Sequence, residues 1–130
     1  MRNSSGFSLI ELLLVTLIIG ILATIAIPRL TAARDRAFVA TMQADLRNLA
    51  TQQEIHYADE LTYSNDFDDL AFSSSDRVTV TVTEASGTGW SATAAHEAFE
   101  DDDGCSVYYG DATATTLGSP GGPGEIACTR

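Results

Sequence analysis

The chain has 130 residues, which allows one folded domain in addition to an N-terminal segment. Its formal net charge is −11, from 18 acidic residues, seven arginines and no lysine. From Thr51 onward there are fifteen acidic residues, opposed only by Arg77 and Arg130. Such a surface repels phosphates, so direct nucleic acid binding is not expected, and the acidity is interpreted as a solubility feature.

The first element is an apolar segment near the N-terminus. Phe7 to Ile27 is a run of 21 residues whose single charged member is Glu11. As a helix it would reach about 30 Å, the thickness of a bilayer core. A domain this small could hardly surround a helix that is apolar on every face. Residues 7–28 are therefore predicted to form a transmembrane helix rather than a buried core helix.

Glu11 is the informative residue of this segment. A carboxylate in apolar surroundings costs a few kcal/mol and usually marks a function. It needs a positive partner, and no basic residue lies nearby on the segment. An α-amino group would serve if residues 1–6 were removed and Phe7 became the new N-terminus.

These residues resemble the type IV prepilins and the pseudopilins of type II secretion. The likeness rests on a short polar leader with Arg2, then Gly6-Phe7-Ser8-Leu9-Ile10-Glu11-Leu12-Leu13, then the apolar run. It implies that residues 1–6 are a leader, that a prepilin peptidase cuts between Gly6 and Phe7, and that the same enzyme methylates the amine of Phe7. It also implies that Glu11 pairs with the N-terminal amine of a neighbouring subunit. Gly20 and Pro28 stand where such helices often carry a Gly and a Pro, and a kink is expected there.

The resemblance also implies a function. The chain would be a structural subunit that polymerises with itself and with other pilin-like subunits into a type IV pilus-like filament, for motility, adhesion or DNA uptake. It would first be a single-pass inner-membrane protein with its C-terminus outside the cytoplasm, served by inner-membrane assembly machinery, and later part of a surface pilus. The first alternative is a pseudopilin of type II secretion in a periplasmic pseudopilus. The second is an anchored or secreted binding domain that does not polymerise.

Two observations at the end of the span oppose parts of this interpretation. An ordinary secretory signal peptide could end at Thr24-Ile25-Ala26, and the mature chain would then begin at Ile27. Glu11 beside the apolar run and Pro28 just beyond it argue against that alternative. In addition, Arg29, Arg34 and Arg36 follow the span, whereas Arg2 alone precedes it. The positive-inside rule favours the opposite orientation to the one that the resemblance implies.

Residues 29–58 are predicted to continue the helix in amphipathic form. Val39, Met42, Leu46 and Leu49 recur at helical spacing, which defines one apolar face for packing. The other face is expected to carry mainly polar residues: Gln43, Asp45, Arg47 and Asn48. No Pro or Gly lies between Arg29 and Asp59, so one continuous helix from near Phe7 to near Ala58 is expected. A coiled-coil partner is a second interpretation of the apolar stripe.

Residues 59–130 are predicted to form a loop, a small antiparallel sheet and a C-terminal loop. The loop has a short helical turn near Asp66 to Leu70. Strands are expected where Val78, Val80 and Val82 alternate with threonines, over Trp90 to Ala98, and at Cys105 to Tyr109, with a short edge strand within Glu125 to Cys128. The whole chain is therefore predicted to be α+β, a long helix followed by a sheet that packs on its second half. This agrees with the pilin fold that the resemblance implies.

Cys105 and Cys128 are the two cysteines of the chain. An even pair behind an export segment indicates one disulfide, because exported proteins meet oxidising surroundings. Two free buried thiols are the alternative. A bridge would close a loop of roughly 24 residues and stabilise the fold by about 3 kcal/mol.

No constellation in the sequence indicates an enzyme. His96 and Glu97 resemble the start of a zinc-protease helix, but the second His is missing and the segment is a predicted strand. His56 stands alone on the predicted helix and is interpreted as a surface or packing group. No cofactor is expected. Two acidic clusters, Asp66 with Asp68 and Asp69, and Asp101 to Asp103, could offer oxygen ligands to calcium, although neither has the spacing of the twelve-residue calcium loop.

Overall fold

The computed structural model describes residues 5–130 of the chain. They divide into two compact units at residue 36, and each unit is described by itself. The first unit holds the predicted cleavage segment and the apolar run. The second, from Ala37 to Arg130, holds the sheet and the hydrophobic core. Residues 1–4 of the predicted leader, with Arg2, lie outside the described residues.

One helix, α1, spans Leu9–Glu60 and has 52 residues. It begins after Ser8, whose carbonyl accepts the first helical hydrogen bond from the Leu12 N–H at 3.2 Å. Pro28 lies inside the helix and does not end it, as expected from the sequence. The helix ends at Glu60, and the next residue, Leu61, has a positive φ of 56° and donates its N–H to the Tyr57 carbonyl at 2.9 Å. The expected single helix is confirmed, with both ends two residues further along the chain.

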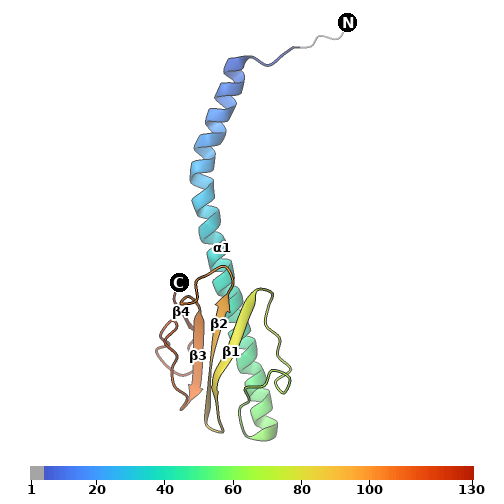
Figure 1. The fold of residues 1–130 in the computed structure, drawn as a ribbon, viewed down its shortest axis with the longest axis vertical. Coiled ribbons are helices and arrows are strands. Elements are labelled where there is room, and N and C mark those ends of the chain that lie inside the picture. Colours follow the sequence, from blue (N-terminus) through green and yellow to red (C-terminus); the bar gives the residue numbers. More distant parts are fainter. Residues whose placement is uncertain (1–4) are drawn as a thin grey trace. The chain divides into compact units, whose positions relative to one another are not determined.

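Four antiparallel strands follow in chain order and lie side by side in the same order (Figure 1). They are β1 (Val78–Ala85), β2 (Gly89–His96), β3 (Cys105–Gly110) and β4 (Ala127–Cys128). The register of β1 on β2 shifts between Val82 and Glu84, which marks a β-bulge. The predicted strands are all present, and the α+β pilin-like fold is confirmed.

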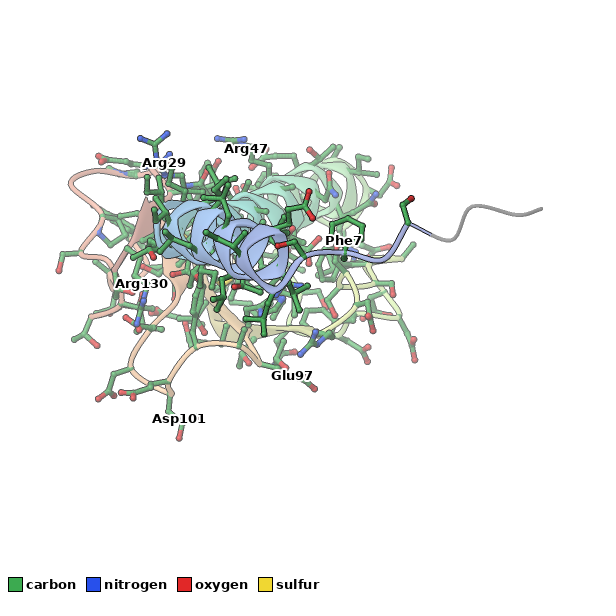
Figure 2. The ribbon with its side chains drawn as sticks, turned by 90° about the horizontal axis from the view of Figure 1, so that it is seen from above. Phe7, Arg29, Arg47, Glu97, Asp101 and Arg130 are labelled. Carbon is green, nitrogen blue, oxygen red and sulfur yellow. A yellow bond between two sulfur atoms is a disulfide. The ribbon has the colours of Figure 1, made fainter. Side chains whose placement is uncertain are left out.

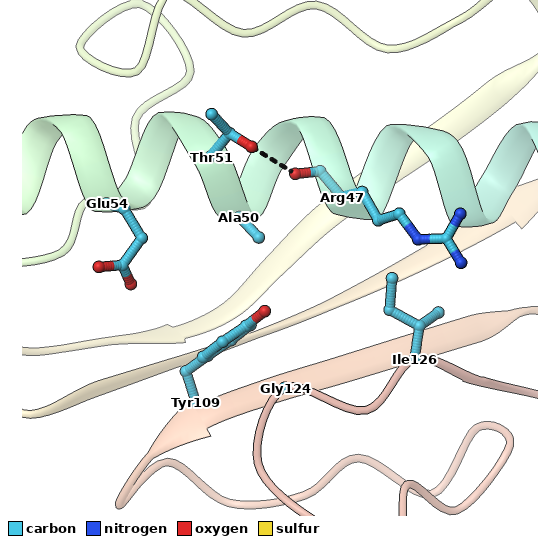
Figure 3. A pocket seen from close by; sticks show the side chains of 7 residues that line it. All are labelled: Arg47, Ala50, Thr51, Glu54, Tyr109, Gly124 and Ile126. Atoms are coloured by element: carbon cyan, nitrogen blue, oxygen red, sulfur yellow. Dashed lines mark hydrogen bonds between the residues drawn. The ribbon is translucent and has the colours of Figure 1, made fainter.

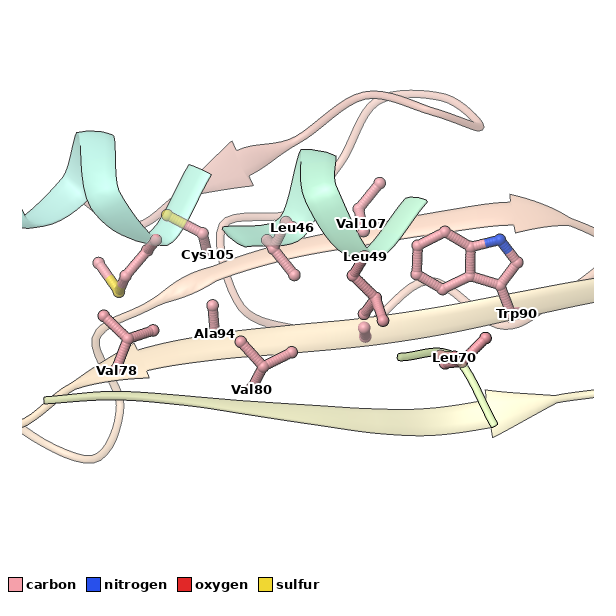
Figure 4. Packing of buried hydrophobic residues seen from close by; sticks show 11 residues of the cluster. Leu46, Leu49, Leu70, Val78, Val80, Trp90, Ala94, Cys105 and Val107 are labelled. Carbon is pink, nitrogen blue, oxygen red and sulfur yellow. The ribbon is translucent and has the colours of Figure 1, made fainter. Parts of the chain in front are cut away.

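The core of the second unit lies between the sheet and the second half of α1 (Figure 4). Met42, Leu46 and Leu49 of the helix are buried, as their spacing predicts. From the sheet side, the apolar residues of alternating positions face them: Val78, Val80, Trp90, Ala92, Ala94, Cys105 and Val107, with Leu70 from the preceding loop. Because strand side chains alternate between faces, this places the threonines of β1 on the opposite, exposed face.

The prediction that Asp45 lies on the polar face of the helix was wrong. Asp45 is buried, and its carboxylate accepts hydrogen bonds from the Ser75 N–H at 2.8 Å and the Ser75 hydroxyl at 2.7 Å. Gln53, about two turns further along the helix, is also buried and exchanges two hydrogen bonds with the backbone of Ser64, at 2.6 and 3.0 Å. A buried polar group is tolerated where its hydrogen bonds are made. These two side chains fasten the loop between α1 and β1 to the helix.

Apolar and polar residues do not alternate strictly along β2, and the structure gives a reason. β2 lies between β1 and β3, and both of its faces are covered, so that Ser91 is buried as well as Trp90 and Ala92. The segment after β3 passes over the outer face of the sheet: Thr113 to Thr116 line one hollow together with Ser91 of β2, and the hydroxyl of Ser106 in β3 donates to the Leu117 carbonyl. A strand that is covered on both faces has no need of polar alternation.

Candidate functional site: the N-terminal segment and its helix

The predicted cleavage site lies in chain without regular secondary structure. Gly6 and Phe7 precede α1, and both are exposed. Nothing lies within 4 Å of the position that a Cβ on Gly6 would occupy, and the Phe7 side chain is 80% exposed. A peptide bond in irregular, uncovered chain can be reached by an enzyme without prior unfolding. The geometry is therefore compatible with cleavage between these residues, which stays a prediction.

Glu11 lies in the first turn of α1, one turn from Phe7. Its Oε2 accepts a hydrogen bond from the backbone N–H of Ser8 at 2.8 Å. This is the contact that a Glu at the third helical position makes with the N-cap residue, and it satisfies a donor that the helix itself leaves free. Ser8 is the residue that our sequence reasoning missed. The pattern Ser8-x-x-Glu11 before an apolar run could have indicated it.

The first unit exposes apolar side chains over its whole length. Fifteen large hydrophobic residues from Phe7 to Leu30 are exposed within the described chain. By length and composition α1 is able to cross a membrane, with the most apolar part near its N-terminus and not buried. An apolar surface of this kind is covered by lipid, by another protein surface or by both in a stable state.

The polar groups inside this apolar stretch are satisfied locally. The hydroxyl of Thr16 donates to the Leu13 carbonyl at 2.9 Å, and that of Thr24 to the Gly20 carbonyl at 2.7 Å. Both side chains therefore enter an apolar environment without a free donor. Nothing lies within 4 Å of the position that a Cβ on Gly20 would occupy. The contacts within the described chain therefore leave room for a side chain at this position. The predicted kink at Gly20 and Pro28 stays a prediction.

The second unit presents an acidic surface. Side chains such as Glu97 and Asp101 stand on the outside of this unit (Figure 2). Arg77 pairs with Glu97 at 3.1 Å, and Arg130 with Asp103 at 2.7 Å. Hydrogen bonds from Arg130 and then Thr129 hold the pKa of Asp103 below its ordinary value.

Tyr63 is a second group of this unit whose titration is shifted. Its hydroxyl donates a hydrogen bond to the Glu54 carboxylate at 3.3 Å. Burial and then the nearby Glu54 charge raise the pKa of Tyr63. The side chain therefore stays neutral at physiological pH and serves as a hydrogen-bond donor.

The predicted cysteine pair is brought together. Cys105 and Cys128 are direct partners in the register of β3 and β4, and a disulfide joins them. Cys105 is fully buried, and the described chain holds no free cysteine. The bridge ties the two-residue strand β4 to the sheet and closes the C-terminal loop. The alternative of two free thiols is thereby excluded.

An open groove of about 440 Å³ lies between α1 and the C-terminal loop (Figure 3). A cation and a carboxylate stand along its helical wall, and an aromatic ring forms the opposite wall. Its lining residues are Arg47, Ala50, Thr51, Glu54, Tyr109, Gly124 and Ile126. The groove holds no nucleophile paired with a base, so its residues do not form a catalytic arrangement.

The residues considered for metal binding have structural contacts instead. His96 is buried, its ring stacks on Phe38 with centroids 4.1 Å apart, and its Nδ1 accepts the Ala98 N–H at 3.0 Å. Asp66 accepts the Asp68 N–H at 2.9 Å, which shapes the turn. Within residues 5–130 no group of three or more His, Cys, Asp or Glu is placed to hold a metal ion. Calcium binding therefore gains no support from the geometry.

The N-terminal segment matches a known motif. Residues 1–27 match the family model described as the prokaryotic N-terminal methylation motif. The matched residues include Gly6, Phe7 and Glu11, together with most of the apolar run.

Three curated proteins are similar to about half of this chain. The major component of a type IV wide pilus of Thermus thermophilus is 46% identical over 65 residues, which are 50% of each chain. Core protein G of the type II secretion system of Pseudomonas aeruginosa is 34% identical over 62 residues, 48% of this chain and 44% of its own length. The type IV major pilin of Myxococcus xanthus is 36% identical over 70 residues, 54% of this chain and 32% of its own. The match thus spans half or less of the length of each of these relatives.

Proposed function

We propose that this chain is a member of the type IV pilin and pseudopilin family, a prepilin that is cut between Gly6 and Phe7 and polymerises into a type IV pilus-like filament. The first part of α1 anchors the subunit in the inner membrane before assembly and forms the filament core afterwards. The acidic second unit faces outward. Prepilin peptidase, inner-membrane assembly machinery and other pilin-like subunits are its proposed partners, and no catalytic role is proposed.

The observation that carries this proposal is a single carboxylate at the start of an exposed apolar helix, one turn from an accessible Gly-Phe bond. Cleavage there would create a positively charged amine at Phe7, four residues before Glu11. In an apolar filament core, a Glu11 carboxylate and the amine of a neighbouring subunit attract each other strongly, because the dielectric constant is low. The hydrogen bond from Ser8 then keeps the carboxylate at the start of the helix, where that amine can approach.

The mature N-terminus tests the processing step. The protein is produced in a host with a prepilin peptidase and purified from its membrane, and its intact mass and first residue are determined. We expect a chain that begins at Phe7 with a methylated amine. A chain that retains residues 1–6, or one that begins at Ile27, would refute the proposal. Gly6→Leu is expected to leave the precursor uncut, whereas Ser5→Ala should be processed normally.

The Glu11 variants test the assembly step. Glu11→Ala is expected to be processed and inserted but to yield no filaments, because the neighbour's amine would be left without a counter-charge. Glu125→Ala, an exposed carboxylate of the second unit, is the matched control and should assemble as the wild type does. Normal filaments from Glu11→Ala would refute the proposed role of that side chain in assembly.

The second candidate function is a pseudopilin of a type II secretion system. The 34% identity to core protein G favours it. The two functions differ in the filament that forms at native expression levels. A long surface filament that contains this chain supports the pilus, whereas retention of secreted proteins in the periplasm on deletion, without loss of surface filaments, supports the pseudopilus.

A further inference from the structure

We propose that, within the filament, the basic segment of residues 29–36 in one copy of this chain binds the acidic C-terminal end of α1 in a second copy. This inference rests on the proposed function and adds a contact outside the apolar core. Two clusters of charge carry it. The basic cluster lies on the side of the membrane where arginines are disfavoured, and the acidic cluster lies at the negative end of a helix dipole. The two clusters are opposite in charge.

The basic segment is the first of these clusters. Arg29, Arg34 and Arg36 are exposed, and Asp35 is the one acidic residue among them, so residues 29–36 carry a net charge of +2. They follow the apolar span, on the side that would be outside the cytoplasm in the proposed orientation. The positive-inside rule disfavours arginines in that position. Their presence there is explained if an anionic surface receives them.

The acidic end of α1 is the second cluster. Asp59 and Glu60 are the last two residues of the helix, both are exposed, and the last turn holds no basic residue. The helix dipole places about half a negative charge at this end, so two further carboxylates there are unfavourable. Neither carboxylate makes a hydrogen bond or ion pair among the described residues 5–130. A cation from outside the chain would relieve this repulsion.

The occupant is a second copy rather than another protein, because the complementary surface is on the same chain. Residues 37–130 contain 16 acidic residues and three arginines, so other copies offer the basic segment a negative surface at high local concentration. The two clusters are different surfaces of one chain, and a contact between them is heterologous. Contacts of that kind generate a ring where the rotation between copies closes and a helical filament where it does not, so this contact is compatible with a filament.

Charge reversal on both sides tests the contact. Arg29→Glu with Arg34→Glu and Arg36→Glu is expected to reduce filament yield about tenfold, since like charges then face each other. Asp59→Arg with Glu60→Arg should do the same. The protein that carries all five changes should recover most of the wild-type yield. If the basic-segment reversal and the acidic-end reversal each lower the filament yield, and the protein with all five changes does not regain it, the proposed pairing is refuted.

A matched control separates this site from general charge effects. Glu100→Arg with Asp101→Arg makes the same change of charge in the turn between β2 and β3. It is expected to assemble normally and to give no recovery when combined with the basic-segment reversal. Recovery with this control would show that total charge, rather than the end of α1, is what matters, and would refute the proposal.

Cross-linking gives a direct test in wild-type-like filaments. The described chain has no free cysteine, so introduced pairs are unambiguous. Arg34→Cys with Glu60→Cys should form intermolecular disulfides that appear as a ladder of dimers and higher species on oxidation. Arg34→Cys with Asp101→Cys should remain monomeric. The reverse pattern would overturn the proposal.

The outcomes distinguish this inference from the proposed function. If wild-type protein keeps its leader or forms no filaments, the proposed function fails and the contact fails with it. If wild-type filaments form and the basic-segment reversal leaves their yield unchanged, this inference alone fails. A basic-segment reversal that lowers membrane retention and is not rescued by the reversed acidic end would assign the arginines to lipid phosphates, and that result also refutes the contact.

Discussion

Asp45, on the second half of α1, holds Ser75 with both oxygens of its carboxylate: the backbone N–H donates at 2.8 Å and the hydroxyl at 2.7 Å. The two residues are 30 positions apart in the chain. Asp45 is buried, so this carboxylate is removed from water and depends on Ser75 for its hydrogen bonds. The pair fixes the end of the loop that leads into β1.

Replacing Asp45 by Ala tests this contact. The free energy of unfolding is expected to fall by about 2–3 kcal/mol, because the Ser75 donors lose a charged acceptor. Urea denaturation of the full chain in detergent, followed by Trp90 fluorescence, measures it. Asn48→Ala, an exposed residue on the same helix, is the control and should change stability by less than about 0.5 kcal/mol. Equal effects from both variants would contradict the role of Asp45.

Leu61 offers a stabilising substitution. It directly follows α1 and has a φ of 56°, a conformation that costs a residue with a Cβ about 1 kcal/mol, and its side chain is 72% exposed. Leu61→Gly is therefore expected to raise the free energy of unfolding by a few tenths to about 1 kcal/mol. Ala58→Gly, inside the last turns of the helix, should lower it by about 1 kcal/mol. A loss of stability in Leu61→Gly would show that its side chain makes contacts that outweigh the strain.

Gly110 ends β3 and cannot carry a side chain without rearrangement. Its φ is +64°, and a Cβ would overlap the carbonyl oxygen of Thr88. Gly110→Ala is expected to destabilise the second unit by about 2 kcal/mol or more, because backbone and not a flexible side chain must move. Gly122→Ala is the matched control, since nothing lies within 4 Å of its built Cβ. In thermal melting, the melting temperature of Gly110→Ala should be clearly lower than that of Gly122→Ala.

The disulfide between Cys105 and Cys128 should account for a large part of the stability of the C-terminal loop. The two residues are 23 positions apart, and removing the bridge is expected to lower the free energy of unfolding by about 3 kcal/mol. The variant that replaces both cysteines by Ala tests this by urea denaturation. Reduction of the wild type should have a similar effect and should not affect the double variant.

Asp103 is expected to make a small contribution to the pH dependence of stability, because the group is exposed to solvent. Hydrogen bonds from Arg130 and then Thr129 lower its pKa in the folded chain from the ordinary value of 3.8. The folded state binds this proton less well than the unfolded state, so the contribution to stability is present above pH 3.8 and is lost as the pH falls through the lowered pKa. Asp103→Asn should flatten the part of the stability profile that lies below pH 3.8. Asp101→Asn should leave it as in the wild type.

Most of the fold was predictable because its signals are local. Apolar side chains at helical spacing, alternating Val and Thr residues, and turn residues between them indicated α1 and all four strands within a few positions. The burial of Asp45 and Gln53 was not predictable in this way, because their partners, Ser75 and Ser64, come from a loop that has no periodic pattern. Ser8 was predictable from its spacing to Glu11 and was overlooked.

The amino-acid sequence by itself determined the apolar helix, the position of Glu11 in it, and the segment in front of Phe7, because these depend on composition and on the distance of one helical turn. Only the tertiary structure decided that Cys105 lies directly opposite Cys128, that β2 is covered on both faces, and that Asp45 is buried. Those features depend on contacts between residues far apart in the chain, and no local pattern encodes the geometry in which such residues meet.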